Sequence, residues 1–101
     1  MPVFEWDEAK NASNLIKHGI SFDEAAVIFE GSVLTVPGFD YGESRSLSIG
    51  SIQSVVFVSV VHTDRNGSIR IISARLANRT ERRLYREHFP EASSGTSEHE
   101  G

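Results

Sequence analysis

Two apolar stretches joined by a tight turn constrain the fold of this chain more than any other part of its sequence. Residues 55–62 are apolar at odd and even positions alike, which is typical of a central strand buried on both faces. Residues 68–75 begin with a β-branched run that fits a second buried strand. The Asn-Gly pair at residues 66–67 favours a tight hairpin turn between them. We therefore expect an antiparallel hairpin in which His62 lies near Arg70.

Residues that cap helices mark three further segments. A first helix is predicted over residues 8–18, with Asp7 as its N-cap and Gly19 as the left-handed residue that closes it. Its apolar stripe, which we expect to face the core, consists of Ala12, Leu15 and Ile16. Two more helices are predicted from capping boxes, in which the N-cap side chain pairs with a glutamate three residues later. These boxes are formed by Ser21 with Glu24 and by Asn78 with Glu81.

The order of these segments predicts a single α+β domain over residues 1–90. We expect an N-terminal strand, two short helices, an antiparallel β-sheet and a C-terminal helix. The other strands are predicted at residues 3–6, 33–36 and 45–52, and a polar loop is predicted at residues 39–44. Residues 91–101 hold no apolar side chain beyond Ala92, so we expect a disordered tail there.

Charge is distributed unevenly along the chain. The net charge is −4, yet residues 1–61 carry three basic against eight acidic side chains, whereas residues 62–88 carry seven arginines against three acids. This asymmetry indicates a molecule with one anion-facing side. It differs from the uniformly basic profile of a protein that coats nucleic acid.

Composition also argues against several classes of protein. The chain has no cysteine, and its four histidines lack the spacing of metal ligands, so we expect no metal site. The longest apolar run is too short to cross a bilayer, and no export signal is visible at the N-terminus. We therefore expect a cytoplasmic protein that does not bind a membrane. A glycine-rich phosphate loop is also absent from the sequence.

The arginines of the C-terminal half are the candidate functional residues. Arg70 and Arg75 lie on an otherwise apolar strand, which favours a ligand-binding role for them. Four more arginines lie on the last predicted helix: Arg79, Arg82, Arg83 and Arg86. We expect the strand end and the helix start to present one cluster of guanidinium groups to a polyanion. The alternative is an ordinary core strand followed by a solvated basic helix.

Several short motifs, spaced along residues 3–89, resemble those of the BrnT family, the toxins of bacterial type II toxin–antitoxin pairs. The most specific part of the resemblance is Arg70-Ile71-Ile72-Ser73-Ala74-Arg75 followed by Glu81-Arg82-Arg83-x-Tyr85. Further support comes from Phe4-Glu5-Trp6-Asp7, Lys17-His18-Gly19, Ile49-Gly50 and Val61-His62-Thr63.

The resemblance implies a RelE-like fold and a metal-independent endoribonuclease that cleaves RNA and arrests translation. It also implies a cognate ribbon-helix-helix antitoxin, similar to BrnA, as the partner. Toxin and antitoxin together would repress their own operon, with the antitoxin making the contacts to operator DNA. No cofactor is expected.

For such a nuclease the residues suggest a division of roles. RNA supplies its own nucleophile, the 2′-hydroxyl, so the protein must neutralise charge on the phosphate and move protons. We assign charge neutralisation to Arg70 and Arg75, with Arg79 next and Lys17 as a further phosphate contact. The remaining RNA-binding candidates are Arg82, Arg83 and Arg86.

Proton transfer has several candidates. Histidine is the usual side chain for proton transfer near neutral pH, which makes His62 a candidate, and His18 could share its site. Glu81 is a candidate base, although a capping-box glutamate already has a structural role. Tyr85 is a candidate acid whose pKa nearby arginines would lower, and the structural alternative is a half-buried helix aromatic. It also remains open that no side chain is a strong base and that positioning supplies most of the rate.

Two other functions fit the same sequence. The chain could be a non-catalytic module whose arginines bind an acidic antitoxin segment, so that the pair acts only in operon autorepression. It could also be a small RNA-binding domain that does not cleave its ligand.

Overall fold

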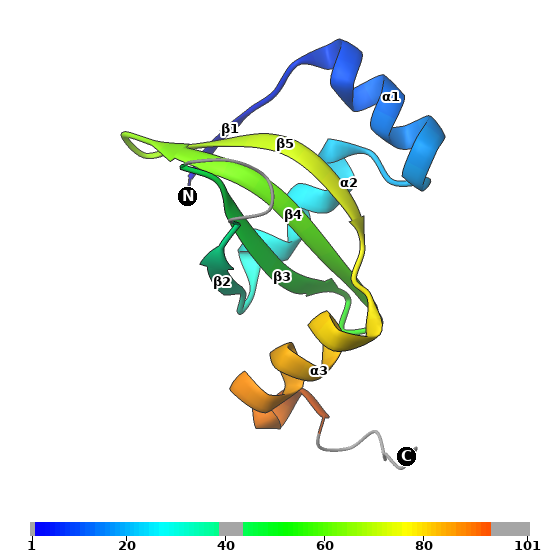
Figure 1. Cartoon of the computed structure of the whole chain (residues 1–101), viewed down its shortest axis with the longest axis vertical. Helices are drawn as coiled ribbons and strands as arrows, with labels where there is room; N and C mark the ends of the chain where they lie inside the picture. The colour runs from blue at the N-terminus through cyan, green and yellow to red at the C-terminus, as the bar shows by residue number, and fades with distance from the viewer. Residues whose placement is uncertain (1, 39–43, 94–101) are drawn as a thin grey trace.

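The computed structural model describes residues 2–38 and 44–93. Within these residues one five-stranded sheet has the order β1-β5-β4-β3-β2, with helices packed against both of its faces (Figure 1). The strands are β1 (Val3–Glu5), β2 (Leu34–Pro37), β3 (Ser46–Ile52), β4 (Val56–Arg65) and β5 (Ser68–Leu76). The helices are α1 (Glu8–His18), α2 (Phe22–Ala26) and α3 (Arg79–His88), with short 3₁₀ helices η1 (Val27–Glu30) and η3 (Pro90–Ser93). The predicted α+β class is confirmed.

The central hairpin forms as the sequence predicts. Strands β4 and β5 pair antiparallel, with Thr63 opposite Arg70. The turn between them has φ of 47° at Asn66 and 90° at Gly67, both in the left-handed region that Asn-Gly pairs tolerate. The sheet is antiparallel except at one edge, where β1, the predicted N-terminal strand, pairs parallel with β5. A parallel pair requires a long connection between its two strands, and here that connection contains α1, α2 and the strands β2, β3 and β4.

A β-bulge in β5 decides which face of the sheet its arginines occupy. Pairing with β4 passes from Ile71 directly to Ser73, which leaves Ile72 as an extra residue. Side chains alternate between faces along a strand, so Arg70 and Arg75, five positions apart, would otherwise lie on opposite faces. The extra residue places both arginines on the same face, which we call the outer face.

The inner face of the sheet packs against α2 and η1 and forms the main core. Its fully buried side chains come from α2, η1, β4 and β5: Phe22, Ala25, Ile28, Val58, Val60, Ile71 and Ala74. Burying a large apolar side chain of this kind stabilises the fold by about 1.5–3 kcal/mol. Gly50 lets η1 approach β3 closely, because a Cβ at this position would lie 2.7 Å from the Cβ of Ile28.

Helix α1 docks onto the sheet through polar contacts. Asp7 caps it and Gly19 closes it at φ 75°, as predicted. The predicted inward stripe is wrong, because Leu15 and Ile16 are 49% and 87% exposed. The buried residue of α1 is instead Asn14, whose amide donates to the carbonyls of Ile20 and Ala74 and accepts from the Ala74 amide. Three hydrogen bonds to backbone groups therefore replace the expected apolar contact.

Helix α3 packs on the outer face at one end of the sheet. Asn78 and Glu81 form the predicted capping box at its start. Tyr85 is buried there in a second apolar cluster, with Ile49, Leu34, Phe57 and Phe89. Beyond α3 the chain forms η3, which includes the first residues of the segment expected to be a disordered tail, and residues 94–101 lie outside the described part of the chain. None of the helices in the described residues is long and apolar enough to span a membrane.

Candidate nucleic-acid interface

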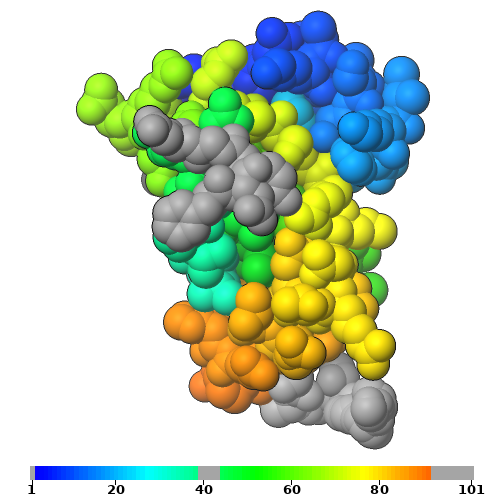
Figure 2. All heavy atoms as spheres, in the orientation of Figure 1, coloured from blue at the N-terminus to red at the C-terminus, as the bar shows by residue number. Residues whose placement is uncertain are grey.

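One side of α3 carries four arginines. Arg79, Arg82, Arg83, Arg86 and Glu87 line a shallow surface hollow, and we call this set the arginine face. Residues spaced by three, four and seven positions lie on one side of a helix, so the sequence spacing alone brings these side chains together. Figure 2 shows α3 at the end of the molecule opposite α1, where its side chains form part of the surface. The arrangement provides a concentrated positive charge without a deep cavity.

The four arginines differ in how firmly they are held. Arg82 donates from Nη1 to the carbonyl of Ala77 at 2.8 Å, and the guanidinium carbon of Arg86 lies 5.3 Å from the centre of the Phe57 ring. Arg79 and Arg83 are exposed and make no ion pair or side-chain hydrogen bond with the described residues. Two ordered and two unpaired guanidinium groups can therefore meet an anion on this surface.

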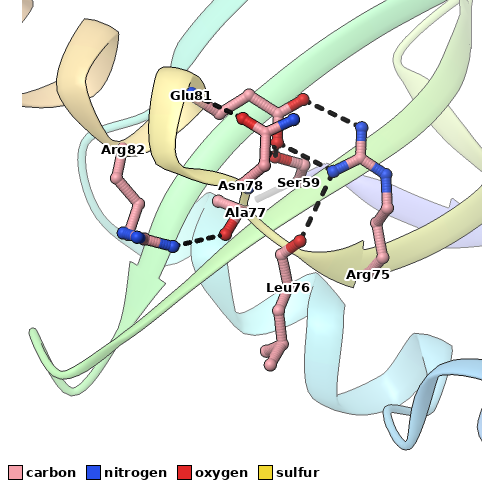
Figure 3. A network of polar contacts seen from close by, with 7 residues as sticks. All are labelled: Ser59, Arg75, Leu76, Ala77, Asn78, Glu81 and Arg82. Carbon is pink, nitrogen blue, oxygen red and sulfur yellow. Dashed lines mark hydrogen bonds and ion pairs between the residues drawn. The ribbon is translucent and has the colours of Figure 1, made fainter.

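Arg75 binds Glu81 where β5 passes into α3 (Figure 3). Its Nη1 donates to Oε1 and its Nη2 donates to Oε2, each at 2.8 Å. The same Oε1 accepts hydrogen bonds from the Ser59 hydroxyl at 2.8 Å and from the Asn78 backbone amide at 2.9 Å. Glu81 thus links β4, β5 and the first turn of α3 through one carboxylate.

These contacts decide the protonation of Glu81. Burial alone would raise its pKa, but the hydrogen bonds from Arg75, Asn78 and Ser59 favour the charged form and lower the pKa from 4.5 to about 2. A carboxylate with so low a pKa is a weak base near neutral pH. The geometry therefore favours the structural role of Glu81 over the role of general base.

Arg70 and Arg75 do not converge in one pocket, contrary to the sequence-based expectation. Arg70 donates from Nη1 to Glu5 of β1 at 3.2 Å, near the edge of the sheet. It lies opposite Thr63 of β4, whereas Arg75 lies opposite Ser59, four residues away along that strand. At about 3.3 Å per residue, these positions are roughly 13 Å apart. Each of the two guanidinium groups is bound to a carboxylate of this chain.

His62 lies inside the protein on the inner face, away from the arginines. It is 2% exposed and packs edge-on against Phe29, with ring centres 5.4 Å apart. Its Nε2 lies 2.7 Å from the Ser48 hydroxyl and its Nδ1 lies 2.8 Å from the Asp64 carboxylate. Ser48 in turn lies 2.7 Å from the hydroxyl of Thr35. The side chains of Ser48, His62 and Asp64 contact one another in the same sequence as in a Ser-His-Asp catalytic triad. Ser48 is fully buried, however, and therefore out of reach of a substrate.

Tyr85 is also a core residue of the α3 end. It is 4% exposed, and its hydroxyl donates to the carbonyl of Ser32 at 2.8 Å. Burial raises the pKa of Tyr85, with a smaller opposing effect from Ser51. The expectation that arginines lower this pKa is therefore wrong, because the hydroxyl points toward Ser32, between η1 and β2, and not toward the guanidinium groups.

Lys17 and His18 occupy the last turn of α1, as the sequence indicated. Figure 1 places α1 and α3 at opposite ends of the sheet, so these two residues are separated from the arginine face. Cations suit the carboxyl end of a helix dipole, which accounts for their position without a ligand.

Two features of the site were missed by sequence reasoning. Glu87 lines the arginine face. Its position four residues after Arg83 places both on one side of the helix, and this spacing could have identified it from the sequence. Phe57, within the stretch expected to be a strand buried on both faces, is partly exposed and contacts Arg86. Within the described residues no group of three or more histidine or acidic side chains is arranged to hold a metal ion.

Comparison with known proteins adds a family relationship to this geometry. Residues 6–81 match the family described as ribonuclease toxin, BrnT, of type II toxin-antitoxin system. Two solved chains are similar in structure. One is the 1.1 Å crystal structure of the Brucella abortus ribonuclease toxin BrnT, with 25% identity and a TM-score of 0.66 over 78% of this chain and 100% of that chain. No curated protein matches the sequence.

Proposed function

Because the chain belongs to the BrnT family of ribonuclease toxins of type II toxin–antitoxin systems, we propose that it is an endoribonuclease that cleaves RNA and thereby arrests translation. The family implies an antitoxin partner, and we propose that this partner is a ribbon-helix-helix protein similar to BrnA. In this proposal the toxin acts in the cytoplasm, and the pair binds operator DNA only through the antitoxin.

The observation that carries the proposal is the arginine face of α3. Four guanidinium groups lie on one side of one helix, and those of Arg79 and Arg83 are unpaired within the described residues. Arginine binds phosphate oxygens through two parallel N–H groups and stays charged at any physiological pH. This surface therefore supports binding of the RNA backbone.

The proposed chemistry relies on charge stabilisation more than on a strong base. The 2′-hydroxyl oxygen attacks the adjacent phosphorus and loses its proton to water, the bond from phosphorus to the 5′-oxygen breaks, and the departing 5′-oxygen takes a proton from water. Negative charge builds up on the phosphoryl oxygens in the transition state. Arginines placed at those oxygens stabilise the transition state, and losing one such contact typically slows a reaction by about 10²–10³-fold. Burial of His62 and Tyr85 and the low pKa of Glu81 support a mechanism in which alignment supplies much of the rate.

Induced expression without the antitoxin tests this function. We expect growth to stop and cellular RNA to fragment after induction. The Arg79→Ala/Arg83→Ala double variant should grow normally and leave RNA intact. Arg65→Ala removes an exposed arginine from the β4–β5 hairpin, away from α3, and should remain toxic. Normal growth and intact RNA with abundant, folded wild-type protein would contradict the proposal.

Arg70 and Arg75 each form an ion pair with a glutamate of this chain, and these ion pairs support a second candidate function, that of a non-catalytic module. Their guanidinium groups already bind Glu5 and Glu81, which leaves fewer charges for a phosphorane. In this alternative the arginine face binds an acidic antitoxin segment and the complex acts only in autorepression. It predicts that the arginine double variant loses antitoxin binding while the wild-type chain never cleaves RNA.

A further inference from the structure

A second hollow is lined by Phe57, the residue whose ring Arg86 lies over. Its volume is about 410 Å³, within the usual size of small-ligand sites. It is enclosed by the link from η1 to β2, by the β3–β4 turn and by α3. We call it the hairpin hollow, and the lining residues that matter below are Glu30, Ser51, Gln53, Ser54, Phe57 and Tyr85.

The lining of the hairpin hollow combines aromatic side chains with hydrogen-bonding groups. The rings of Phe57 and Tyr85, both of which line the hollow, meet edge to face with centres 5.4 Å apart. The hydroxyls of Ser51 and Ser54 and the amide of Gln53 supply donors and acceptors. Unpaired RNA bases are recognised by this combination of aromatic contact and hydrogen bonds to the base edge.

The turn that forms the outer wall is held in an unfavourable conformation. Gln53 and Ser54 have φ of 55° and 60°, and the amide of Val55 donates to the carbonyl of Ile52 at 3.1 Å. Two successive left-handed residues in such a turn are usually glycine or asparagine, because other side chains are strained there. Strain of this kind concentrates at functional sites, and here both strained residues line the hollow.

The position of the hollow connects it to the arginine face. Phe57 lines the hairpin hollow, and Arg86, which lines the arginine face, lies over the Phe57 ring. Glu30 lines the hollow as well, and its negative charge disfavours a phosphate there. A carboxylate is instead a good acceptor for the exocyclic amino group of a base.

Resting on the proposed function, we propose that the hairpin hollow binds one base of the RNA and makes cleavage depend on that base. The phosphates on either side of this nucleotide lie along the arginine face. The hollow selects adenine, cytosine or guanine, each of which carries an exocyclic amino group for Glu30, and disfavours uracil, which has none. The side chains of Gln53 and Ser54 hold the base edge in place.

The test uses a variant that should fold at least as well as the wild type. Gln53→Gly/Ser54→Gly removes both side chains and places glycine where φ is positive, which relieves strain. The matched control is Asn66→Gly, because Asn66 has φ of 47° in the turn at the other end of β4. Both changes place glycine at a positive φ in a turn next to β4, but only the first alters the hollow.

The first measurement is a cleavage map of a mixed-sequence RNA. The wild type and Asn66→Gly should disfavour uracil about tenfold at one fixed position next to the cut. Gln53→Gly/Ser54→Gly should still cleave, with this discrimination reduced to about twofold or less. An unchanged preference in the double variant would overturn the proposal while leaving the ribonuclease function in place.

The second measurement does not depend on cleavage. In NMR titrations with the four nucleoside 5′-monophosphates, the amide signals of Ser51, Gln53 and Ser54 should shift with AMP, CMP and GMP more than with UMP. Shifts in an inactive protein would support the base site and contradict the ribonuclease assignment. Absence of shifts at these residues with any nucleotide would overturn the base site.

Discussion

The guanidinium group of Arg75 and the carboxylate of Glu81 are joined by two parallel hydrogen bonds of 2.8 Å each. Glu81 also accepts from Ser59 of β4 and from the amide of Asn78, the N-cap residue of α3. The pair therefore fixes the angle at which α3 leaves the sheet. Since the arginine face is carried by α3, this contact also fixes where the charges of the arginine face lie.

Removing the Glu81 charge should destabilise the protein more than removing the other outer-face ion pair. Glu81→Gln leaves Arg75 without its charged partner and should lower the free energy of unfolding by about 2 kcal/mol. Glu5→Gln breaks the contact with Arg70, in which both side chains are more than 30% exposed, and should cost less than about 1 kcal/mol. Urea unfolding of both variants measures the difference, and equal losses would contradict the role assigned to Glu81.

The same pair should make stability depend on acid pH. The pKa of Glu81 is lowered from 4.5 to about 2, so its charged form stabilises the folded state above about pH 4.5. This contribution decreases as the pH falls from 4.5 through 2, because the unfolded state then binds the proton first. The stability difference between the wild type and Glu81→Gln should therefore shrink between pH 5 and pH 2.5, by on the order of 2 kcal/mol after allowance for solvent screening. A difference that stays constant over this range would show that the Glu81 charge does not contribute.

The arginine face should govern the salt dependence of RNA binding. Each phosphate contact on single-stranded RNA contributes a slope of about 0.7 in a plot of log K against log salt. Arg79→Ala/Arg83→Ala should reduce the slope by about 1.4 and weaken binding to all sequences alike. The assay is fluorescence anisotropy with a 2′-deoxy-substituted oligonucleotide that resists cleavage. Arg65→Ala serves as the control. An equal reduction of the slope in this variant would indicate that RNA binds to charge spread over the whole surface rather than to the arginine face.

His62 should matter for folding and not for the reaction. His62→Ala removes the contact with Phe29 and the hydrogen bonds to Ser48 and Asp64, and should lower the free energy of unfolding by about 3 kcal/mol. We expect folded His62→Ala molecules to cleave RNA at the wild-type rate when the assay is done at low temperature, where the destabilised variant is folded. A fully folded His62→Ala protein without activity would instead place His62 in the catalytic machinery.

The parts of the fold set by local rules could be predicted from sequence. The N-cap at Asp7, the two capping boxes and the Asn-Gly turn each depend on residues within four positions of one another, and all of them form. The register of the main hairpin followed from its turn.

The parts set by distant contacts could not be predicted. Nothing near Ile72 in the sequence indicates the bulge that moves Arg75 to the face of Arg70. The apolar stripe of α1 points outward because Asn14 meets backbone groups of Ile20 and Ala74, the latter 60 residues away. The partner of Arg70 was missed for the same reason, because Glu5 is 65 residues away in the chain. Glu81 is six residues from Arg75 and reaches it because of the way the chain turns from β5 into α3.

The central claim is that the arginine face of α3 directs cleavage of RNA by its own 2′-hydroxyl. The most direct measurement incubates the purified chain with 5′-labelled RNA in excess EDTA, beside the Arg79→Ala/Arg83→Ala variant and an all-deoxy oligonucleotide of the same sequence. We expect the wild type to release fragments with a 2′,3′-cyclic phosphate, the variant to be slower by at least about a hundredfold, and the deoxy strand to stay intact. Intact RNA with the folded wild-type protein, or equal cleavage by the variant, would contradict the claim.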